Sequence, residues 1–495
     1  MDENTWAPPK DQAPDGKSEN PISGPVDIDP MLDAATIVQR FLATKMQVHP
    51  EVVRYLSEKD DPGLIDQIIA SVPGDTIVVS VQHIPGLHQD RDGARFLTDP
   101  SCEVIRGAVG TTKSISHITD YCHYFRDRYQ RLGECIRPRA SPMPIEALKK
   151  GSRYRQEACS IMGLVMESKT TTNGHRIVEI EDSSASISVL FHKERPQFQE
   201  AETLVPDEVV GVRGTLSGDG RLFFAEQLFR PDIPLTHAPF RSETPGSAVL
   251  ISDVHVGSDT FLEDAWSRFA DWLSDSDASY LLIAGDLVDG IGVYPNQEQE
   301  LTITNIYEQY EVFGSMLRDL PSRMKIVISP GNHDVVRAAE PQPAIPPEFT
   351  ANFPSNCVMV ENPALVSLQG VRVQMYHGRS IDDFISLIPG ASYENAAPMM
   401  TGMLQRRHLA PTYGKRTPIA AGREDSLIID PIPEVLHTGH VHIMGVTDYR
   451  GVLCINSGTW QGQTSFQKQM NITPTPGRAV LLDLQTLSTR VLDFT

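Results

Sequence analysis

The sequence predicts a multidomain α/β protein. Its 495 residues exceed the size of one ordinary domain, and a hydrophobic fraction of 40% can fill several cores. From residue 245 to 495, aliphatic runs typical of strands alternate with segments of helical spacing, which indicates a layered α/β domain. Before it, residues 146–240 contain five β-rich segments broken by turns, and residues 30–75 contain short amphipathic segments.

The first 75 residues divide into two parts. Residues 1–29 are rich in Pro, Asp, Gly, Ser and Asn and lack an aliphatic pattern, so we expect a disordered tail. Within 30–75, apolar residues at positions i, i+3 and i+4 predict three short helices, in LDAATIVQRFLATK, HPEVVRYLSE and PGLIDQIIASV. This small helical domain is either a docking module for another protein or a structural cap, and the sequence leaves both open.

Residues 76–145 are expected to form a linker region around one long helix. A strand-like run, TIVVSVQHI, comes first, and the helical spacing of 115–136 predicts the helix. The segment RPRASPMPI (137–145) is typical of a linker. We expect the aromatic side chains of the helix to pack against protein more than to stack on bases; they are Tyr121, Tyr124 and Phe125.

The region 146–240 has the pattern of a small β-barrel. Its five β-rich segments are separated by turns, and Asn173-Gly174 between two of them is a strong hairpin signal. Five short strands of this kind predict an OB-type barrel. OB folds often bind single-stranded nucleic acid through aromatic side chains. The aromatic residues available for that here are Phe191, Phe223, Phe224 and Phe229. We expect most of them in the core, which favours a scaffold over a DNA-binding platform.

In the last region, 245–495, five strand-like runs end on histidine, aspartate or asparagine. Helices are predicted between them over 261–275 and 304–320. The runs are AVLISD, YLLIAGD, KIVISPGNHD, VRVQMYHG and the shorter EVLHTGHVH, and they bring Asp253, His255, Asp286, Asn332, His333, Asp334, His377, His440 and His442. Ligands of an open α/β sheet lie beyond the carboxyl ends of its strands, so these side chains are expected to converge on one crevice.

This mixture of imidazoles, carboxylates and one carboxamide predicts a dinuclear site for divalent ions. No cysteine is among them, so Mn, Mg, Fe or Zn with N and O ligands suits the set better than a thiolate structural zinc. Two cations repel each other, and Asp286 is the natural bridging carboxylate. Such a pair, about 3.5–4 Å apart, activates water against a phosphate ester. His333 would point to the leaving-group oxygen as a general acid, with Asp334 orienting its ring.

Each motif has an ordinary structural explanation when it stands alone. Asp-x-His is most often a surface turn, Gly-Asp a helix cap, and a single histidine behind a strand a hydrogen-bonded core residue. Five such motifs in this order, each behind a strand, are hard to obtain by accident. Their combination therefore predicts a metal-dependent phosphoesterase.

The order D-x-H, G-D, G-N-H-D, H-G and G-H-x-H resembles that of the calcineurin-like metallophosphoesterases. Longer stretches resemble the small subunit of archaeal family-D DNA polymerase over about residues 150–495: LISDVHVGSDTF (250–261), AGDLVDGIGVYPNQ (284–297), YHGRSIDDFI (376–385), the run 410–442 and INSGTWQGQTSFQ (455–467). In that family the subunit is the proofreading 3′–5′ exonuclease of a heterodimer. Related eukaryotic B-subunits share the architecture but have lost metal ligands, whereas here every ligand position is filled.

The resemblance implies a two-sheet sandwich with flanking helices and two ions. One ion would be held by Asp253, His255, Asp286 and His442. The other would be held by Asp286, Asn332, His377 and His440. The implied partners are a large catalytic subunit and single-stranded or frayed DNA ends, with the sliding clamp as a further candidate.

The composition sets limits on partners and location. A formal net charge of −21 argues against a protein that coats nucleic acid over its whole surface, and it suits docking on a more basic subunit. A local basic track over 406–423 or a solvated loop of mixed charge explains the basic residues there equally well; they are Arg406, Arg407, His408, Lys415, Arg416 and Arg423. The six scattered cysteines, the absence of a 20-residue apolar run and the polar N-terminus predict a reduced, cytoplasmic chain without membrane contact.

Three functions remain open at this point. The first is a proofreading exonuclease subunit. The second is an architectural polymerase subunit without catalysis, which the complete ligand set disfavours. The third is a stand-alone phosphatase or phosphodiesterase with the same site chemistry, which the long region before the site disfavours.

Overall fold

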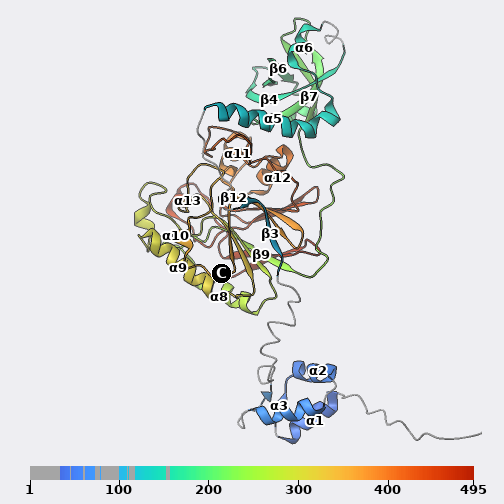
Figure 1. Ribbon diagram of the computed structural model, residues 1–495. Coiled ribbons are helices and arrows are strands. Elements are labelled where there is room, and N and C mark those ends of the chain that lie inside the picture. The colour runs from blue at the N-terminus through green and yellow to red at the C-terminus, as the bar shows by residue number, and fades with distance from the viewer. Residues whose placement is uncertain are drawn as a thin grey trace, which may run out of the picture. The chain divides into compact units, whose positions relative to one another are not determined.

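The computed structural model describes residues 34–44, 46–59, 62–72, 78–79, 100–108, 110, 118–151 and 157–495 (Figure 1). The chain forms two compact units, Met1–Leu97 and Thr98–Thr495. The predicted disordered tail, 1–29, lies outside the described residues, as does most of the strand-like run TIVVSVQHI.

The smaller unit contains helices at the three predicted segments. They are α1 (Ala34–Ala43), α2 (Pro50–Lys59) and α3 (Pro62–Ser71). The two-residue strands β1 (Gln47–Val48) and β2 (Val78–Val79) pair in parallel. The apolar residues of the helical spacing form the core: Ile37, Phe41, Val52, Leu56, Ile65 and Ile68.

An eleven-stranded sheet forms the centre of the larger unit. Its order is β15-β16-β14-β13-β12-β11-β10-β9-β17-β18, and β3 pairs with β12 beside this path. The strands are β3 (Cys102–Ala108), β9 (Ser247–Ile251), β10 (Tyr280–Ala284), β11 (Lys325–Ser329), β12 (Cys357–Leu368), β13 (Val371–Met375), β14 (Val435–Thr438), β15 (Gly445–Tyr449), β16 (Val452–Asn456), β17 (Arg478–Asp483) and β18 (Thr489–Asp493).

The long strand β12 joins two halves of this sheet. Its first residues pair in parallel with β11, and its later residues pair antiparallel with β13 and β3. Between these stretches Pro363 cannot donate a ladder hydrogen bond, so regular pairing is interrupted there. Leu250 and Leu282 belong to the core between the halves, whereas their neighbours Val249 and Leu281 belong to the core on the opposite face.

Helices cover both outer faces of the sheet. α8 (Glu263–Asp275) and α9 (Ile306–Arg318), at the two predicted segments, pack on the half that contains β9–β11. α11 (Ile381–Leu387) and α12 (Ala397–Arg406) pack on the half that contains β14 and β16. The layers are therefore helix, sheet, sheet and helix. Three short helices complete this domain: η3 (Gln297–Glu300), α10 (Pro347–Thr350) and α13 (Ser465–Gln469).

Five strands at the five predicted segments close into a barrel in the order β4-β5-β6-β8-β7. They are β4 (Cys159–Thr170), β5 (Arg176–Glu181), β6 (Ser186–Phe191), β7 (Val209–Leu216) and β8 (Leu222–Phe229), with α6 (Ile145–Lys150) and α7 (Gln197–Glu202) beside them. At the predicted hairpin turn Gly174 has the positive φ, +80°, that such turns require. Phe191 and Phe223 are buried in the barrel core, while Phe224 is exposed.

The helix α5 (Ile118–Ala140) ends later than predicted, so the predicted boundary between helix and linker at residue 136 is wrong. It continues beyond 136 into the segment 137–145, through Pro138, which lacks an N–H and costs the helix one hydrogen bond. The last turn persists because Ile136 is buried against the barrel. In Figure 1, α5 lies between the barrel and the helices α11 and α12.

A second correction to the predicted linker region is the strand β3, which pairs with β12. Cys102 and Val104 pack against the core between the sheet halves, whereas Ile105 is 43% exposed. Glu103 and Arg106 interrupt the apolar pattern, so this strand is recognised only through the strand beside it.

The aromatic residues of α5 pack against protein, as predicted. Tyr124 is buried, and the rings of Tyr121 and Phe125 meet Tyr413 edge to face, with centroids 5.6 and 5.9 Å apart. Beside them, Arg128 donates from Nε to Oδ2 of Asp425 at 2.7 Å.

Arg128, Asp425 and His408 form a fully buried network that fastens α5 to the sheet domain. The ring Nε2 of His408 lies 2.8 Å from the same Asp425 oxygen that Arg128 contacts. Burial alone would raise the pKa of Asp425, but its contacts with His408 and Arg128 hold it well below the usual value. Burial and the charge of Arg128 lower the pKa of His408 to about 4.

Asp425→Ala should lower the free energy of unfolding by about 3–5 kcal/mol, because it leaves the buried guanidinium of Arg128 without its carboxylate. Urea denaturation measures the loss, and adding Arg128→Met should recover part of it. The control is Glu146→Ala, which removes an exposed 2.6 Å ion pair with Lys150 and should cost less than about 1 kcal/mol. Equal losses for Asp425→Ala and the control would contradict this interpretation.

The same network should make the fold sensitive to acid. His408 has a folded pKa of about 4 against an ordinary value of 6.5, so its contribution to stability is complete above pH 6.5 and lost as the pH falls to about 4. The depressed pKa of Asp425 acts in the same direction at lower pH. Urea midpoints should therefore fall less steeply between pH 6.5 and pH 4 in His408→Asn, which removes the titrating imidazole.

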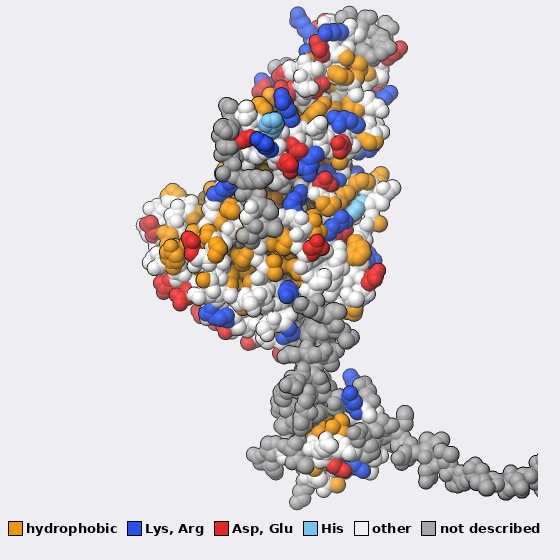
Figure 2. Space-filling view, in the orientation of Figure 1, with side chains coloured by type: hydrophobic (Ala, Val, Ile, Leu, Met, Phe, Trp, Pro, Cys, Tyr) orange, Lys and Arg blue, Asp and Glu red, His pale blue; other side chains and the backbone are white. Residues whose placement is uncertain are grey.

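The structure corrects the predicted basic track over 406–423. The Nε of Arg406 is buried 2.5 Å from a carboxylate oxygen of Glu208, and Arg407 donates to a backbone carbonyl at 2.8 Å. Arg406 therefore lies at the junction with the barrel, Arg407 is held by the sheet domain and His408 belongs to the buried network, so these three residues belong neither to a track nor to a solvated loop. The exposed members are Lys415, Arg416 and Arg423. On the face shown in Figure 2, Lys and Arg are interspersed with Asp and Glu.

Among the described residues, none of the helices combines the length and the apolar character needed to cross a membrane.

Candidate metal centre

The structure brings all seven predicted ligands to the carboxyl ends of five strands. Behind β9, β10, β11, β13 and β14 stand, in this order, Asp253 with His255, Asp286, Asn332, His377, and His440 with His442. β9, β10 and β11 run parallel in one half of the sheet, and β13 and β14 run parallel in the other. Their ends meet in a single crevice.

Five of these residues have a left-handed backbone. The φ angles are +53° for Asp253, +56° for His255, +53° for Asp286, +71° for His440 and +60° for His442. Such a conformation costs a non-glycine residue about 1–3 kcal/mol, and it persists where the surroundings impose it. Strain concentrated on residues of one crevice is typical of a functional site.

Glycines next to the ligands allow the close approach of these loops. A Cβ on Gly331 would lie 2.2 Å from Oδ1 of Asp286, and one on Gly439 would lie 2.3 Å from Oδ2 of Asp253. The glycine in the motifs G-N-H-D and G-H-x-H is therefore required by packing against a neighbouring ligand.

The first group of side chains consists of Asp253, His255 and His442. The Nε2 atoms of the two histidines are 3.1 Å apart, and Oδ1 of Asp253 lies 3.4 Å from Nε2 of His442 and 3.9 Å from Nε2 of His255. Two ligand atoms bound at about 2.0–2.1 Å to one ion lie about 3–3.5 Å apart at tetrahedral or octahedral angles. The 3.1 and 3.4 Å spacings fit a shared ion, and the 3.9 Å spacing requires a wider angle at the ion.

The second group consists of Asp286, Asn332, His377 and His440. Nε2 of His377 lies 3.1 Å from Oδ2 of Asp286 and 3.1 Å from the amide oxygen of Asn332. His440 offers a ligand atom within 4.8 Å of those of Asp286 and His377. Its Nε2 also lies 3.3 Å from Asp382, so an ion bound through this nitrogen would displace that contact.

Asp286 lies between the two groups. Its Oδ2 is 3.1 Å from Nε2 of His377 in one group and 3.8 Å from Nε2 of His255 in the other. Its Oδ1 accepts the backbone N–H of His333 at 2.8 Å, which fixes the carboxylate. This position suits a bridging ligand.

Hydrogen bonds behind the histidines fix which ring nitrogen faces the crevice. Nδ1 of His255 meets the Asp289 carboxylate at 2.9 Å, and Nδ1 of His377 meets the Ala284 carbonyl at 2.9 Å. These oxygens only accept, so both Nδ1 atoms carry a proton and Nε2 is left to bind an ion. His442 differs: its Nδ1 faces the Gln467 amide nitrogen at 2.8 Å, so an ion on Nε2 requires this amide to turn.

The charges of the crevice favour a cation. Burial would raise the pKa of Asp286, but His377 and His333 outweigh it and hold the pKa well below its usual range. Burial would lower the pKa of His377, yet the charge of Asp286 raises it to about 10. The Asp286 carboxylate is thus paired with a positive charge on His377, and an ion bound at Nε2 of His377 would take the place of that proton. Buried His and Asp groups with these spacings can hold metal ions.

His333 and Asp334 differ in role from each other. The ring Nδ1 of His333 lies 2.7 Å from the carbonyl oxygen of Asp289, and its side chain lines the cavity above the ligands. The prediction that Asp334 orients the imidazole of His333 is wrong, because its carboxylate bonds to other groups. Its carboxylate accepts the N–H of Leu287 at 3.2 Å and the N–H of Gly331 at 2.8 Å, and so braces the loops after β10 and β11. It also accepts the hydroxyl of Tyr310 on α9 at 2.8 Å.

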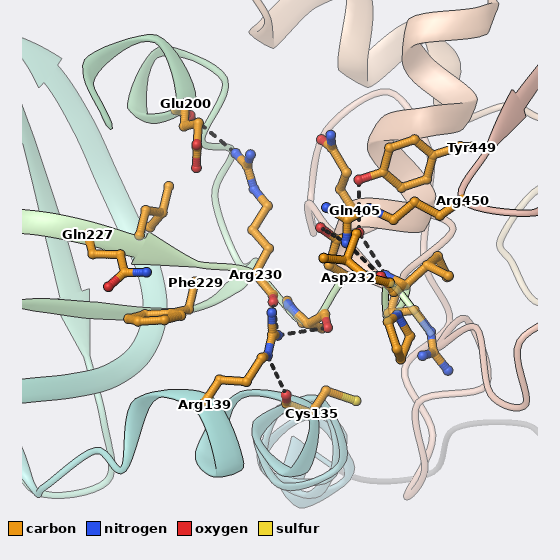
Figure 3. Close-up of a pocket in the computed structure, with 16 residues that line it drawn as sticks. Cys135, Arg139, Glu200, Gln227, Phe229, Arg230, Asp232, Gln405, Tyr449 and Arg450 are labelled. Atoms are coloured by element: carbon orange, nitrogen blue, oxygen red, sulfur yellow. Dashed lines mark hydrogen bonds and ion pairs between the residues drawn. The ribbon is translucent and has the colours of Figure 1, made fainter. Parts of the chain in front are cut away.

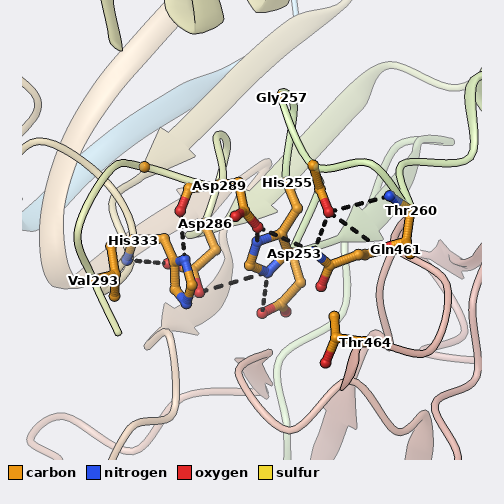
Figure 4. A network of polar contacts seen from close by, with 12 residues as sticks. Asp253, His255, Gly257, Thr260, Asp286, Asp289, Val293, His333, Gln461 and Thr464 are labelled. Atoms are coloured by element: carbon orange, nitrogen blue, oxygen red, sulfur yellow. Dashed lines mark hydrogen bonds and ion pairs between the residues drawn. The ribbon is translucent and has the colours of Figure 1, made fainter. Parts of the chain in front are cut away.

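Sequence reasoning missed three residues that support the ligands. Asp289 holds His255, Asp382 holds His440 and Gln467 contacts His442. Figure 4 shows Asp289 beside His255 and His333 in the same polar network. A signal existed for Asp289, a second acid three residues after Asp286 in an otherwise apolar loop. Asp382 and Gln467 stand on short helices with no distinctive pattern.

A larger cavity, of about 710 Å³, lies between the barrel and the sheet domain (Figure 3). Arg450 is paired there with Asp232 at 2.9 Å, and Arg139 donates to the carbonyls of Arg230 and Pro231. The histidine–carboxylate groups found among the described residues lie elsewhere, around the smaller cavity of about 370 Å³ at the strand ends. Size therefore does not identify the candidate metal centre here.

Comparison with known proteins shows the family to which this chain belongs. Residues 248–443 match the family described as the B-subunit of DNA polymerase alpha/epsilon. A DNA polymerase II small subunit from Halobacterium salinarum is 37% identical, with 94% of this chain and all of the relative covered. One from Methanothermobacter thermautotrophicus is 45% identical over 77% of this chain and 81% of the relative.

Among solved structures, one described as a novel archaeal phosphodiesterase aligns with 50% of this chain over 98% of its own length, at a TM-score of 0.27 and 13% identity. The sequence relatives are decisive, because they extend over both units and not over the crevice alone. This chain belongs to the family of small subunits of archaeal DNA polymerase II, the family-D polymerase.

Proposed function

We propose that this chain is the 3′–5′ exonuclease of a heterodimeric replicative DNA polymerase and hydrolyses DNA phosphodiester bonds with two divalent metal ions. The observation that carries the proposal is the convergence of a complete ligand set on one crevice. The 3′–5′ direction rests on the family resemblance. The carboxylate and amide oxygens of the set suit Mn²⁺ or Mg²⁺, and the imidazoles suit Fe or Zn.

In this proposal each ligand belongs to one of two ions. Asp253, His255, Asp286 and His442 hold the first. Asp286, Asn332, His377 and His440 hold the second. When bound, the two ions neutralise the phosphate charge and activate water for attack.

The other residues of the crevice orient the ligand imidazoles or supply a proton to the leaving group. The Asp289 carbonyl holds Nδ1 of His333, which leaves Nε2 facing the cavity as the donor of a proton to the departing 3′ oxygen. Asp289 and Ala284 keep the ligand imidazoles in the form that binds metal. The barrel, proposed to be of the OB type, acts as a scaffold.

The test is incubation of the purified chain with 5′-labelled single-stranded DNA and Mn²⁺, beside a p-nitrophenyl phosphate assay. We expect stepwise shortening of the DNA from its 3′ end. Hydrolysis of p-nitrophenyl phosphate alone would favour a stand-alone phosphatase. Bound metal without any hydrolysis would favour an architectural subunit.

The proposed partners are a large catalytic subunit and frayed DNA ends, with the sliding clamp as a further candidate. The helical, barrel and phosphoesterase segments account for the described chain and leave no part for nucleotide polymerisation. A proofreading nuclease must receive its strand from a polymerase. We therefore propose that the large subunit docks on the barrel and sheet domains near the crevice.

Deleting residues 1–97 should leave the complex with the large subunit intact, because the helical unit ends at Leu97. Deleting residues 1–140 should destroy it, because that cut also removes β3 from the sheet and the buried Arg128 of α5. Co-purification with the large subunit checks both. Loss of the complex in the shorter deletion would move the interface to the helices α1–α3.

A further inference from the structure

The cavity over the candidate metal centre has a polar floor and an apolar opening. Five of the seven predicted ligands are buried and Asn332 and His440 are half-buried, whereas three apolar residues that line the same cavity are exposed: Val293 by 39%, Phe466 by 59% and Met470 by 51%. Scattered exposed apolar residues are ordinary, but a group at the opening of a polar site marks a binding surface. In Figure 4, Val293 lies beside His333, and Thr464, directly before α13, lies on the opposite side of the histidine cluster.

The helix that carries Phe466 is tied to the candidate metal centre. Thr464 and Gln467 form a capping box at the start of α13, and Nε2 of Gln467 lies 2.8 Å from Nδ1 of His442. Phe466 directly precedes Gln467 in the chain. The backbone of Phe466 is therefore held beside the ligands, and its exposed ring projects from there.

Other walls of the cavity supply positive charge and a second aromatic ring. The guanidinium of Arg379 contacts the carbonyl of Ala338 at 3.0 Å, and that of Arg416 contacts the phenol oxygen of Tyr393 at 3.5 Å. Neither contact is with a carboxylate, although the charges of Glu340 and Asp382 lie near Arg379 and Arg416 respectively. Both guanidinium groups line the cavity and are placed to contact a phosphate. The ring of Tyr294 lies beside His333, with centroids 6.2 Å apart.

A nucleotide matches the polar floor, the arginines and the exposed aromatic ring together. A phosphodiester fits the polar floor, the flanking phosphates fit the arginines, and a base has a flat face for an exposed aromatic ring. In duplex DNA the faces of the bases are stacked on one another, and an aromatic side chain reaches a base only where pairing is lost. A simple phosphate ester has no such face.

We propose that Phe466, flanked by Met470 and Val293, stacks on a base of an unpaired DNA strand and so selects frayed ends over paired ones. This inference rests on the proposed exonuclease function and adds the residue that recognises its substrate. Phe466 is a positioning residue, because it contacts the base and not the reacting phosphate.

The first experiment compares Phe466→Ala with the unmodified full chain, alone and co-purified with the large subunit. KM for single-stranded DNA should rise about 10-fold, the order expected of one base–aromatic stack, while kcat changes little. Hydrolysis of bis-p-nitrophenyl phosphate, which has no base, should be unchanged. Phe466→Trp should restore the KM. The control is Tyr307→Ala, since Tyr307 is an equally exposed aromatic residue, at 60%, outside the cavity.

The second experiment locates the stacked base. Oligonucleotides that carry one abasic position within three nucleotides of the 3′ end are bound to both proteins with Ca²⁺ present, and the dissociation constants are measured by fluorescence anisotropy. At one position, removal of the base and Phe466→Ala should not be additive, because each removes the same contact. Additive effects at all positions would overturn the proposal.

The binding measurement also separates this inference from the proposed activity. If the unmodified chain binds unpaired DNA through Phe466 but does not cleave it, the exonuclease proposal fails and the stacking site stands. If DNA is cleaved and Phe466→Ala binds unpaired DNA as well as the unmodified chain does, the stacking proposal fails and the exonuclease proposal stands. If the variant instead loses only the large subunit, the exposed group is a protein-docking surface and the stacking proposal is wrong.

Discussion

Asp286→Ala should empty or scramble the metal centre and abolish hydrolysis of DNA. The carboxylate lies 3.1 Å from Nε2 of His377 and 3.8 Å from Nε2 of His255, so it is the group shared by the two sets of ligands. Without it, two cations in one crevice repel each other with no anion between them. The remaining ligands are mostly neutral imidazoles, which bind a pair of divalent ions weakly.

Metal content measured by plasma emission checks this expectation. Asp286→Asn retains the shape and removes the charge, so it should also lose metal if the charge is what matters. The control is Asp271→Ala, which removes an exposed carboxylate from the surface of α8 in the same domain. Circular dichroism should show that the variants fold. Normal metal content in both Asp286 variants would contradict the assignment of this residue as the bridge.

The position of the candidate site could be predicted from the sequence because each ligand follows a recognisable strand. The aliphatic runs fix five strand ends, and the sheet brings strand ends together whatever the loops do. Local pattern was therefore enough to place His377, although it is separated by 45 residues from its neighbour Asn332 in the crevice. The five barrel strands could be predicted for the same reason, since their pattern is local.

The supporting contacts could not be predicted, because they depend on which loops meet. Asp334 is adjacent to His333 in the chain but points back to Gly331 and Tyr310, while Asp289, 44 residues away, supplies the carbonyl that holds the ring. Sequence proximity was a poor guide to which carbonyl or carboxylate contacts the imidazole.

A run of basic residues in the sequence is also misread when some of its side chains are buried in the fold. Arg406 belongs to a run of basic residues that is typical of a surface track, yet its partner is Glu208 in the barrel, about two hundred residues earlier in the chain. The strand β3 also depends on a distant segment, because its alternation of buried and exposed side chains is recognised only when it pairs with β12. Pairing between distant segments decides both, and a single sequence does not contain that information.

His333→Ala should retain both metals and lose DNA cleavage by about 10²–10⁴-fold, the range of a positioned general acid. Metal should stay because alanine keeps the backbone N–H that donates to Oδ1 of Asp286 at 2.8 Å, and because the ring bonds to the Asp289 carbonyl and to none of the predicted ligand atoms.

The identity of the leaving group tests the role of His333 most sharply. A deoxyribose 3′ oxygen needs a proton to depart, whereas p-nitrophenolate departs without one. The loss in His333→Ala should therefore be large on DNA and small on bis-p-nitrophenyl phosphate, with plasma emission confirming that metal is retained. An equal loss on both substrates would mean that His333 stabilises the phosphate itself. Loss of metal together with a disturbed fold would mean that His333 is a ligand or a structural residue.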